Sequence, residues 1–181
     1  MVANTFRFIF IPILLSALIA EAREHPQEDA LKANYLLQLS KFIHWPTINL
    51  AQTSPITLCL FATTPSKNNW KTLQSRKIQG REIQLLYINQ DDQISQCNTL
   101  FIHKLIPNSV IKKNYYRLIS NSILTIGERK NFAKEGGIIE LDLTDKNMSI
   151  KINIQSATEA GLNIHANLIE IAATVYKQGQ H

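Results

Sequence analysis

Residues Ile56–Ala62 read ITLCLFA, a short and nearly all-apolar run. A strand that is covered on both faces has this pattern, because all of its side chains are buried. Further strand-like segments follow at Arg81–Ile88, Thr99–His103 and Ile123–Ile126, and helix-like stretches lie between them. Alternation of strands and helices predicts an α/β fold with a mixed, mostly parallel sheet flanked by helices.

Residues 138–154 follow a different pattern, in which apolar and polar side chains alternate. A reversal at residues 144–147 pairs apolar side chains across two strands: Ile139 with Ile152, Leu141 with Ile150, and Leu143 with Met148. The same register places Glu140 opposite Lys151 on the other face. Because one register satisfies every pair, the sequence predicts a C-terminal antiparallel hairpin with one buried face.

Helices are expected before and after this sheet. Apolar side chains recur at helical spacing over residues 29–43, and Trp45-Pro46 ends that helix because a residue before proline is pushed out of the α region. Ser156 and Glu159 have the spacing of a capping box. A later apolar set predicts a final amphipathic helix, with Gly161 before it: Leu162, Leu168, Ile169, Ala172 and Val175.

The first 22 residues have the layout of a secretory signal peptide. Arg7 is followed by the apolar stretch Phe8–Ala20 and then by Ala20-Glu21-Ala22, a small-x-small cleavage site. An uncleaved anchor is the alternative, but the apolar stretch is shorter than the about 20 residues that span a bilayer. We therefore expect residues 1–22 to be removed and residues 23–181 to form one exported domain.

Composition excludes some classes of function. The chain has a formal net charge of +5, and 45% of its residues are hydrophobic, as in ordinary globular proteins. Its basic residues are scattered singly or in pairs, whereas nucleic-acid-binding proteins usually show a clustered basic stripe. We therefore expect no nucleic-acid partner.

Cys59 and Cys97 are the only cysteines of the chain. In an oxidising compartment two cysteines favour a structural disulfide, which would stabilise the fold by roughly 4 kcal/mol on the chain-entropy model. A redox-active dithiol is the alternative, but it usually has C-x-x-C spacing or groups that stabilise a thiolate.

Catalytic motifs are missing from the sequence. It contains no G-x-S-x-G elbow, P-loop or dinucleotide fingerprint, and its five histidines show no metal-ligand spacing. Trp45 and Phe132 lie beside predicted helix ends, where core packing is the simpler interpretation and a pocket the alternative. We expect no cofactor, no metal and no enzymatic activity.

Several segments of the chain together match the pattern of a known family. The segment from Lys32 to Pro46 is similar to "KAxYLxxxxKFxxWP", the opening of the YfiR family of periplasmic proteins. Shorter matches follow in the same order along the chain: Ile78-Gln79-Gly80-Arg81, Cys97 to Ile102, Leu124 to Gly127, Phe132, Gly136-Gly137-Ile138, Ile152-Asn153, Ala157, Gly161-Leu162 and Leu168.

The resemblance implies a periplasmic negative regulator that binds the periplasmic sensor domain of an inner-membrane diguanylate cyclase. Such a regulator restrains cyclic-di-GMP synthesis and biofilm formation, is captured by an outer-membrane-associated partner, and tends to dimerise. The resemblance also implies a Cys59–Cys97 disulfide. Lys134 and Glu135 stand where some members have a second cysteine pair.

The resemblance also implies a small-ligand pocket formed by His44, Trp45, Asn163 and His165. Arginine is common in such places, and its replacement by His44 and Asn163 argues against recognition of an anion, because neither side chain forms a guanidinium fork. Two other hypotheses remain at this stage: a periplasmic small-ligand-binding domain that serves another receptor, and a hydrolase with an unrecognised site.

Overall fold

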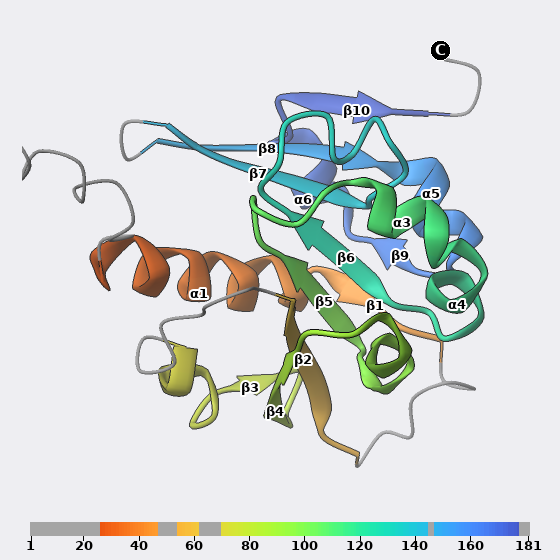
Figure 1. Cartoon of the computed structure of the whole chain (residues 1–181). Coiled ribbons are helices and arrows are strands. Elements are labelled where there is room, and N and C mark those ends of the chain that lie inside the picture. Colours follow the sequence, from red (N-terminus) through yellow and green to blue (C-terminus); the bar gives the residue numbers. More distant parts are fainter. Residues whose placement is uncertain (1–25, 47–53, 62–69, 145–146, 178–181) are drawn as a thin grey trace, which may run out of the picture.

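The computed structural model describes residues 26–46, 54–61, 70–144 and 147–177 (Figure 1). Its strands are β1 (Ile43–His44), β2 (Ile56–Phe61), β3 (Lys77–Ile78), β4 (Arg81–Ile88), β5 (Thr99–Ile102), β6 (Leu124–Gly127), β7 (Ile139–Thr144), β8 (Asn147–Asn153), β9 (Asn163–Ile164) and β10 (Thr174–Tyr176). Its helices are α1 (Pro26–Lys41), α3 (Ser109–Lys113), α4 (Tyr115–Ser120), α5 (Ile154–Glu159) and α6 (Ala166–Glu170), with 3-10 helices η1 (Lys71–Leu73) and η2 (Asp91–Gln96). The predicted signal peptide lies outside the described residues, and none of the described helices is long and apolar enough to cross a membrane.

An eight-stranded sheet in the order β10-β8-β7-β6-β5-β2-β4-β3 forms the centre of the fold. Strands β4, β2, β5, β6 and β7 are mutually parallel, which confirms the predicted mostly parallel sheet. The hairpin of β7 and β8 has the predicted register, with Leu141 opposite Ile150 and Glu140 opposite Lys151. A second, two-stranded sheet joins β1 to β9.

Both faces of this sheet are covered, as the apolar composition of β2 predicts. Ile56, Leu58 and Leu60 belong to the larger core cluster, together with residues of α1, α5 and α6. Cys59 and Phe61 point to the opposite face, where they join a smaller cluster with residues of η2, α3 and α4. The sheet is therefore the middle of three layers (Figure 1).

Three local predictions need correction. Helix α1 ends at Lys41, because Ile43 and His44 leave the helix to pair with Ile164 and Asn163 of β9. The capping-box prediction is wrong: Asn153 is the N-cap of α5, and its Oδ1 accepts a hydrogen bond of 2.9 Å from the backbone N–H of Ser156.

The last helix is shorter than the apolar pattern suggested. Helix α6 ends at Glu170, and the chain then forms β10, in which Val175 is paired in parallel with Ile152 of β8. The edge of β8 offers unpaired backbone groups, so the chain gains strand hydrogen bonds there instead of extending the helix.

Candidate functional site

The predicted pocket residues come together at the two-stranded sheet. His44 of β1 lies directly opposite Asn163 of β9, and both side chains are exposed. Tertiary pairing thus joins two segments that are far apart in the sequence. The groove and the cavity described below are lined by other residues, so a ligand site at His44 and Asn163 stays a prediction.

Trp45 has a structural role in this region. It packs against the larger core cluster, and its indole N–H donates a hydrogen bond of 3.3 Å to the carbonyl of Asn98. The Asn98 side chain in turn accepts from the backbone N–H of Thr57 at 2.8 Å. Trp45 therefore ties the segment after β1 to the central strands, and its polar atom is already engaged.

His165 also has a local structural contact. It is the N-cap of α6, where its Nδ1 accepts a hydrogen bond from the Asn167 backbone N–H at 3.3 Å. Its own backbone N–H donates to the Phe42 carbonyl at 2.9 Å, which extends the pairing of β1 with β9.

A disulfide joins Cys59 to Cys97, as predicted. Cys59 lies in the middle of β2, and Cys97 follows η2 immediately before β5, with the two Cα atoms 5.6 Å apart. Both cysteines are buried, with exposed fractions of 0% and 2%. The bond therefore fastens η2 to the central strand from within the smaller core cluster, where solvent reductants have little access.

A buried ion network lies at the carboxyl ends of the parallel strands. The Lys32 Nζ atom of α1 is 2.7 Å from Glu128 Oε1, just after β6, and 2.9 Å from Glu28 Oε1 one turn earlier in α1. His103, just after β5, places Nε2 3.9 Å from the second oxygen of Glu128. Lys32 is only 1% exposed, so its charge depends on these carboxylates.

This network lies at the carboxyl ends of β5 and β6, beside the point at which the strand order of the sheet reverses. The strand order reverses between β2 and β5, because β4 lies on one side of β2 while β5, β6 and β7 extend on the other. The sequence patterns described above did not predict this ion network. A signal was present, since Lys32 lies one turn before Leu36 and therefore shares the apolar face of α1.

The structure adds a groove that the sequence did not predict. It has a volume of about 560 Å³ and is bordered by α3, the segment 131–136, the start of α5 and the end of β10. We call it the Tyr115 groove; it is lined by Lys112, Tyr115, Asn131, Lys134, Glu135, Gly136, Asn153, Gln155, Ser156, Glu159, Tyr176 and Lys177.

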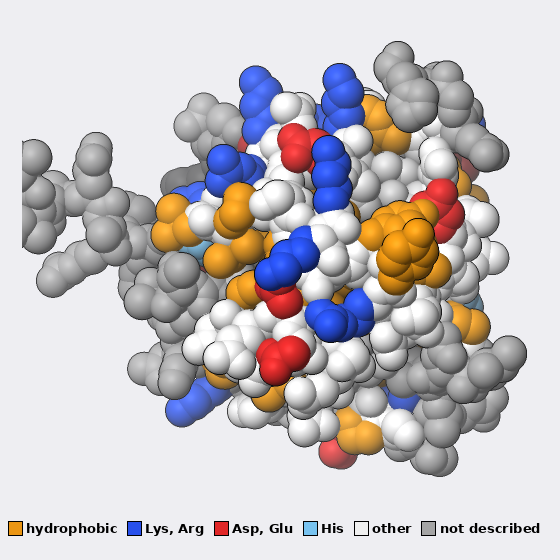
Figure 2. Space-filling view, turned by 45° about the vertical axis from the view of Figure 1, so that its right-hand side comes forward, with side chains coloured by type: hydrophobic (Ala, Val, Ile, Leu, Met, Phe, Trp, Pro, Cys, Tyr) orange, Lys and Arg blue, Asp and Glu red, His pale blue; other side chains and the backbone are white. Residues whose placement is uncertain are grey.

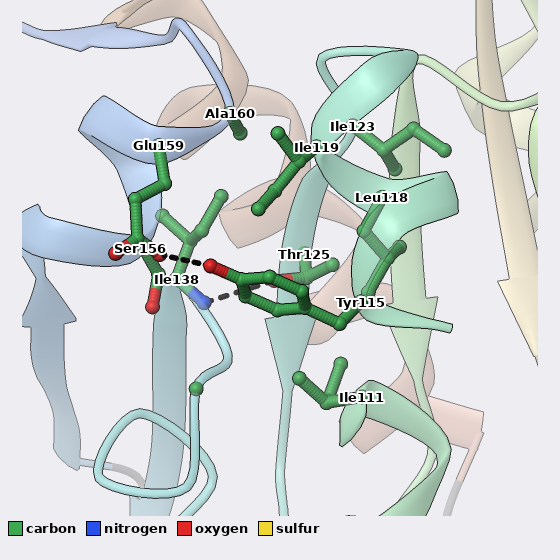
Figure 3. Close-up of a pocket in the computed structure, with 11 residues that line it drawn as sticks. Ile111, Tyr115, Leu118, Ile119, Ile123, Thr125, Ile138, Ser156, Glu159 and Ala160 are labelled. Carbon is green, nitrogen blue, oxygen red and sulfur yellow. Dashed lines mark hydrogen bonds between the residues drawn. The ribbon is translucent and has the colours of Figure 1, made fainter. Parts of the chain in front are cut away.

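Tyr115 separates the groove from a smaller apolar cavity. This cavity, of about 20 Å³, shares Tyr115, Gly136, Ser156 and Glu159 with the groove. Its other walls are mostly aliphatic and include Ile111, Leu118, Ile119, Ile123, Ile138 and Ala160 (Figure 3). The Tyr115 hydroxyl donates a hydrogen bond of 3.0 Å to Glu159 Oε2 across the opening. This bond to a carboxylate raises the pKa of Tyr115 above its ordinary value.

Within the described residues no group of three or more His, Cys, Asp or Glu side chains is placed to hold a metal ion. The candidate sites among these residues are thus an exposed histidine–asparagine pair, a buried ion network and a polar groove beside an apolar cavity. A family model described as YfiR/HmsC-like matches residues 29–173.

The chain belongs to the YfiR/HmsC-like family. The matched range includes every described strand of this YfiR-like protein except β10. This family assignment indicates a regulatory protein of diguanylate cyclase signalling.

Among solved structures, the YfiR-like chain is similar to a conserved domain protein from Vibrio cholerae O1 biovar El Tor, with a TM-score of 0.55 and 10% sequence identity. That match covers 79% of this chain and 59% of the Vibrio cholerae chain, and it supports the fold alone. An ABC domain in complex with L-Trp from Streptococcus pneumoniae matches with a TM-score of 0.47 and 10% identity, over 77% of this chain and 61% of that one. The chain thus spans less than two thirds of either structure, and no curated protein matches it.

Proposed function

We propose that this YfiR-like protein is a periplasmic inhibitor of an inner-membrane diguanylate cyclase. It binds the periplasmic sensor domain of the cyclase and so lowers the synthesis of cyclic-di-GMP. The observation that carries the proposal is the family match over residues 29–173. A disulfide buried in the core supports it, because such bonds persist in oxidising compartments.

Control in this proposal passes through protein–protein contact. A domain in the periplasm is separated by the membrane from the cytoplasm in which cyclic-di-GMP is made, so it acts through a partner that spans the membrane. An outer-membrane-associated protein that captures the regulator would release the cyclase, and self-association of the regulator would tune the free concentration.

Deletion of the gene tests the proposal in cells. Cellular cyclic-di-GMP should rise in the deletion strain and return to its original level when the wild-type gene is restored. In a parallel binding experiment, the purified domain should retain the periplasmic domain of the cyclase on a column. Unchanged cyclic-di-GMP in the deletion strain, together with the absence of a complex, refutes the proposal.

A ligand-binding role predicts a different result. The observation that favours a ligand site is that His44 lies opposite Asn163 and that both residues are exposed. A small molecule bound there would raise the unfolding temperature of the wild-type protein, and this shift should be lost in a His44→Ala variant. Stabilisation without cyclase binding would favour the ligand-binding role over inhibition.

A further inference from the structure

The Tyr115 groove has walls that are fixed from several sides. The segment that carries Lys134 and Glu135 is held by Phe132, which is completely buried. The Ala133 carbonyl accepts a hydrogen bond of 2.8 Å from the side chain of Asn153, the N-cap residue of α5. Because these contacts join two borders of the groove, a partner binds a surface that is already ordered, and little conformational entropy is lost.

The charge of the groove is positive where it is accessible. Lys112, Lys134 and Lys177 line it and are exposed, and no acidic side chain in the described part of the chain is paired with them. Glu159 is already engaged, because its two oxygens accept from the Tyr115 hydroxyl and from the Gln155 side chain. The charged groups at the rim that remain accessible are therefore three ammonium groups and one carboxylate, that of the exposed Glu135.

A neighbouring hollow extends this charge. It has a volume of about 460 Å³, shares Asn131 and Glu135 with the Tyr115 groove, and adds Arg129 and Lys130 to the same side of the molecule. On the face shown in Figure 2, Lys and Arg side chains lie to one side of an exposed hydrophobic patch, with Asp and Glu side chains among them. This surface complements carboxylates and not a second basic surface.

Two aromatic side chains are exposed beside each other: Tyr115 lines the groove, and Tyr116 lines a neighbouring hollow that also contains Asp91 and Asp92. Tyr115 is 40% exposed and Tyr116 is 84% exposed, and their rings meet edge to face with centroids 5.4 Å apart. Tyrosines are enriched at protein interfaces, where they supply contact area at a low cost in entropy. The aliphatic cavity that shares Tyr115 with the groove adds a small apolar surface.

We propose that the Tyr115 groove is a docking surface for an acidic segment of a protein partner. Carboxylates of the segment pair with Lys112 and Lys134, and an apolar or aromatic side chain packs against Tyr115 and Tyr116. A second copy of this chain fits poorly, because an isologous contact through this face brings its lysines together. The inference goes beyond the proposed function, since it specifies the surface and the chemistry of the partner and not which protein the partner is.

Site-specific photocrosslinking in cells tests this surface. A photoreactive phenylalanine analogue in place of Tyr116 should form an adduct with a partner, and mass spectrometry should map the adduct to a segment rich in Asp and Glu. Lys112→Glu combined with Lys134→Glu should lower the adduct yield at least tenfold. Lys71→Glu combined with Arg76→Glu makes the same change in net charge on exposed residues at the other edge of the sheet, and should leave the yield unchanged.

Each other outcome is informative. An adduct to the cyclase domain supports both proposals, whereas a charge-dependent adduct to an acidic segment of another protein supports the docking surface and assigns it to a partner other than the cyclase. The docking surface is refuted by the absence of an adduct at Tyr116, by an adduct only to a second copy, or by equal yields in both charge-reversal variants. Melting curves of all variants should agree, which excludes misfolding as the cause of a lost adduct.

Discussion

Phe132 and the glycines beside it give the sharpest test of the packing. The ring is completely buried, and a Cβ atom added at Gly127 would lie 2.5 Å from it. A Cβ atom at Gly137 would approach the ring still more closely from the other side. Ordinary contacts between carbon atoms are about 3.5–4.0 Å. Because the ring is confined on both sides, it cannot move to relieve an overlap.

Gly137→Ala should therefore lower the free energy of unfolding by about 3 kcal/mol, at the upper end of the usual cost of overpacking. Phe132→Ala should cost about 3–5 kcal/mol through the cavity it leaves. In the Phe132→Ala background the additional cost of Gly137→Ala should nearly vanish, because the new methyl group occupies the vacated space. The two substitutions should thus be coupled by more than about 1 kcal/mol.

Denaturant unfolding of the wild type, the two single variants and the double variant measures this coupling. Gly80→Ala is a useful control, because an added Cβ meets no atom within 4 Å at that position, although its φ of +80° disfavours a side chain. Its cost should be the same with or without Phe132. The predicted overlap with Phe132 is refuted if the free energy of unfolding of Gly137→Ala stays within about 0.5 kcal/mol of the wild-type value. It is also refuted if Gly137→Ala lowers that free energy equally in the wild-type and Phe132→Ala backgrounds.

Three further predictions concern the disulfide and two ion pairs. Replacing Cys59 and Cys97 by alanine opens a loop whose ends are 38 residues apart, and should lower stability by roughly 4 kcal/mol in denaturant unfolding; an unchanged midpoint would contradict this. Lys32→Met leaves the buried Glu128 carboxylate without its ammonium partner and should cost about 3–5 kcal/mol, to be measured in the same way. A hydrogen bond to the buried carboxylate of Glu140 in β7 raises the pKa of Lys151. The contribution of Lys151 to the free energy of unfolding is therefore complete below the unfolded-state pKa of 10.5 and is lost as pH rises through the higher folded-state pKa. The difference in free energy of unfolding between wild type and Lys151→Met should therefore shrink above pH 10.5. A difference that grows there would refute the raised pKa of Lys151.

Local patterns were sufficient where one arrangement satisfies them. The alternation in residues 138–154 predicted the pairing of Leu141 with Ile150 and of Glu140 with Lys151, and the structure confirms both. A register shift of one residue would have moved every apolar side chain to the wrong face. The all-apolar sequence of β2 likewise predicted a strand with both faces covered.

Predictions from local patterns were wrong where a distant part of the chain offers backbone partners for strand pairing. Val175 has helical spacing with Leu168, yet it lies in β10 because the edge of β8 supplies strand partners. His44 leaves the end of α1 for a similar reason, since Asn163 of β9 lies opposite. In each case the alternative partner lies far away in the sequence, so no local periodicity reveals it.

The sequence by itself determined the class of fold, the positions of most strands along the chain, the disulfide pair and the family. These features depend on patterns within one segment, or on the small number of cysteines. Only the tertiary structure brought Lys32 to Glu128 and Tyr115 to Glu159, because each pair joins elements that are distant along the chain. The Tyr115 groove likewise arises from the packing of α3, α5 and β10 around segment 131–136, and the shape of a surface is a property of that packing and not of any one segment.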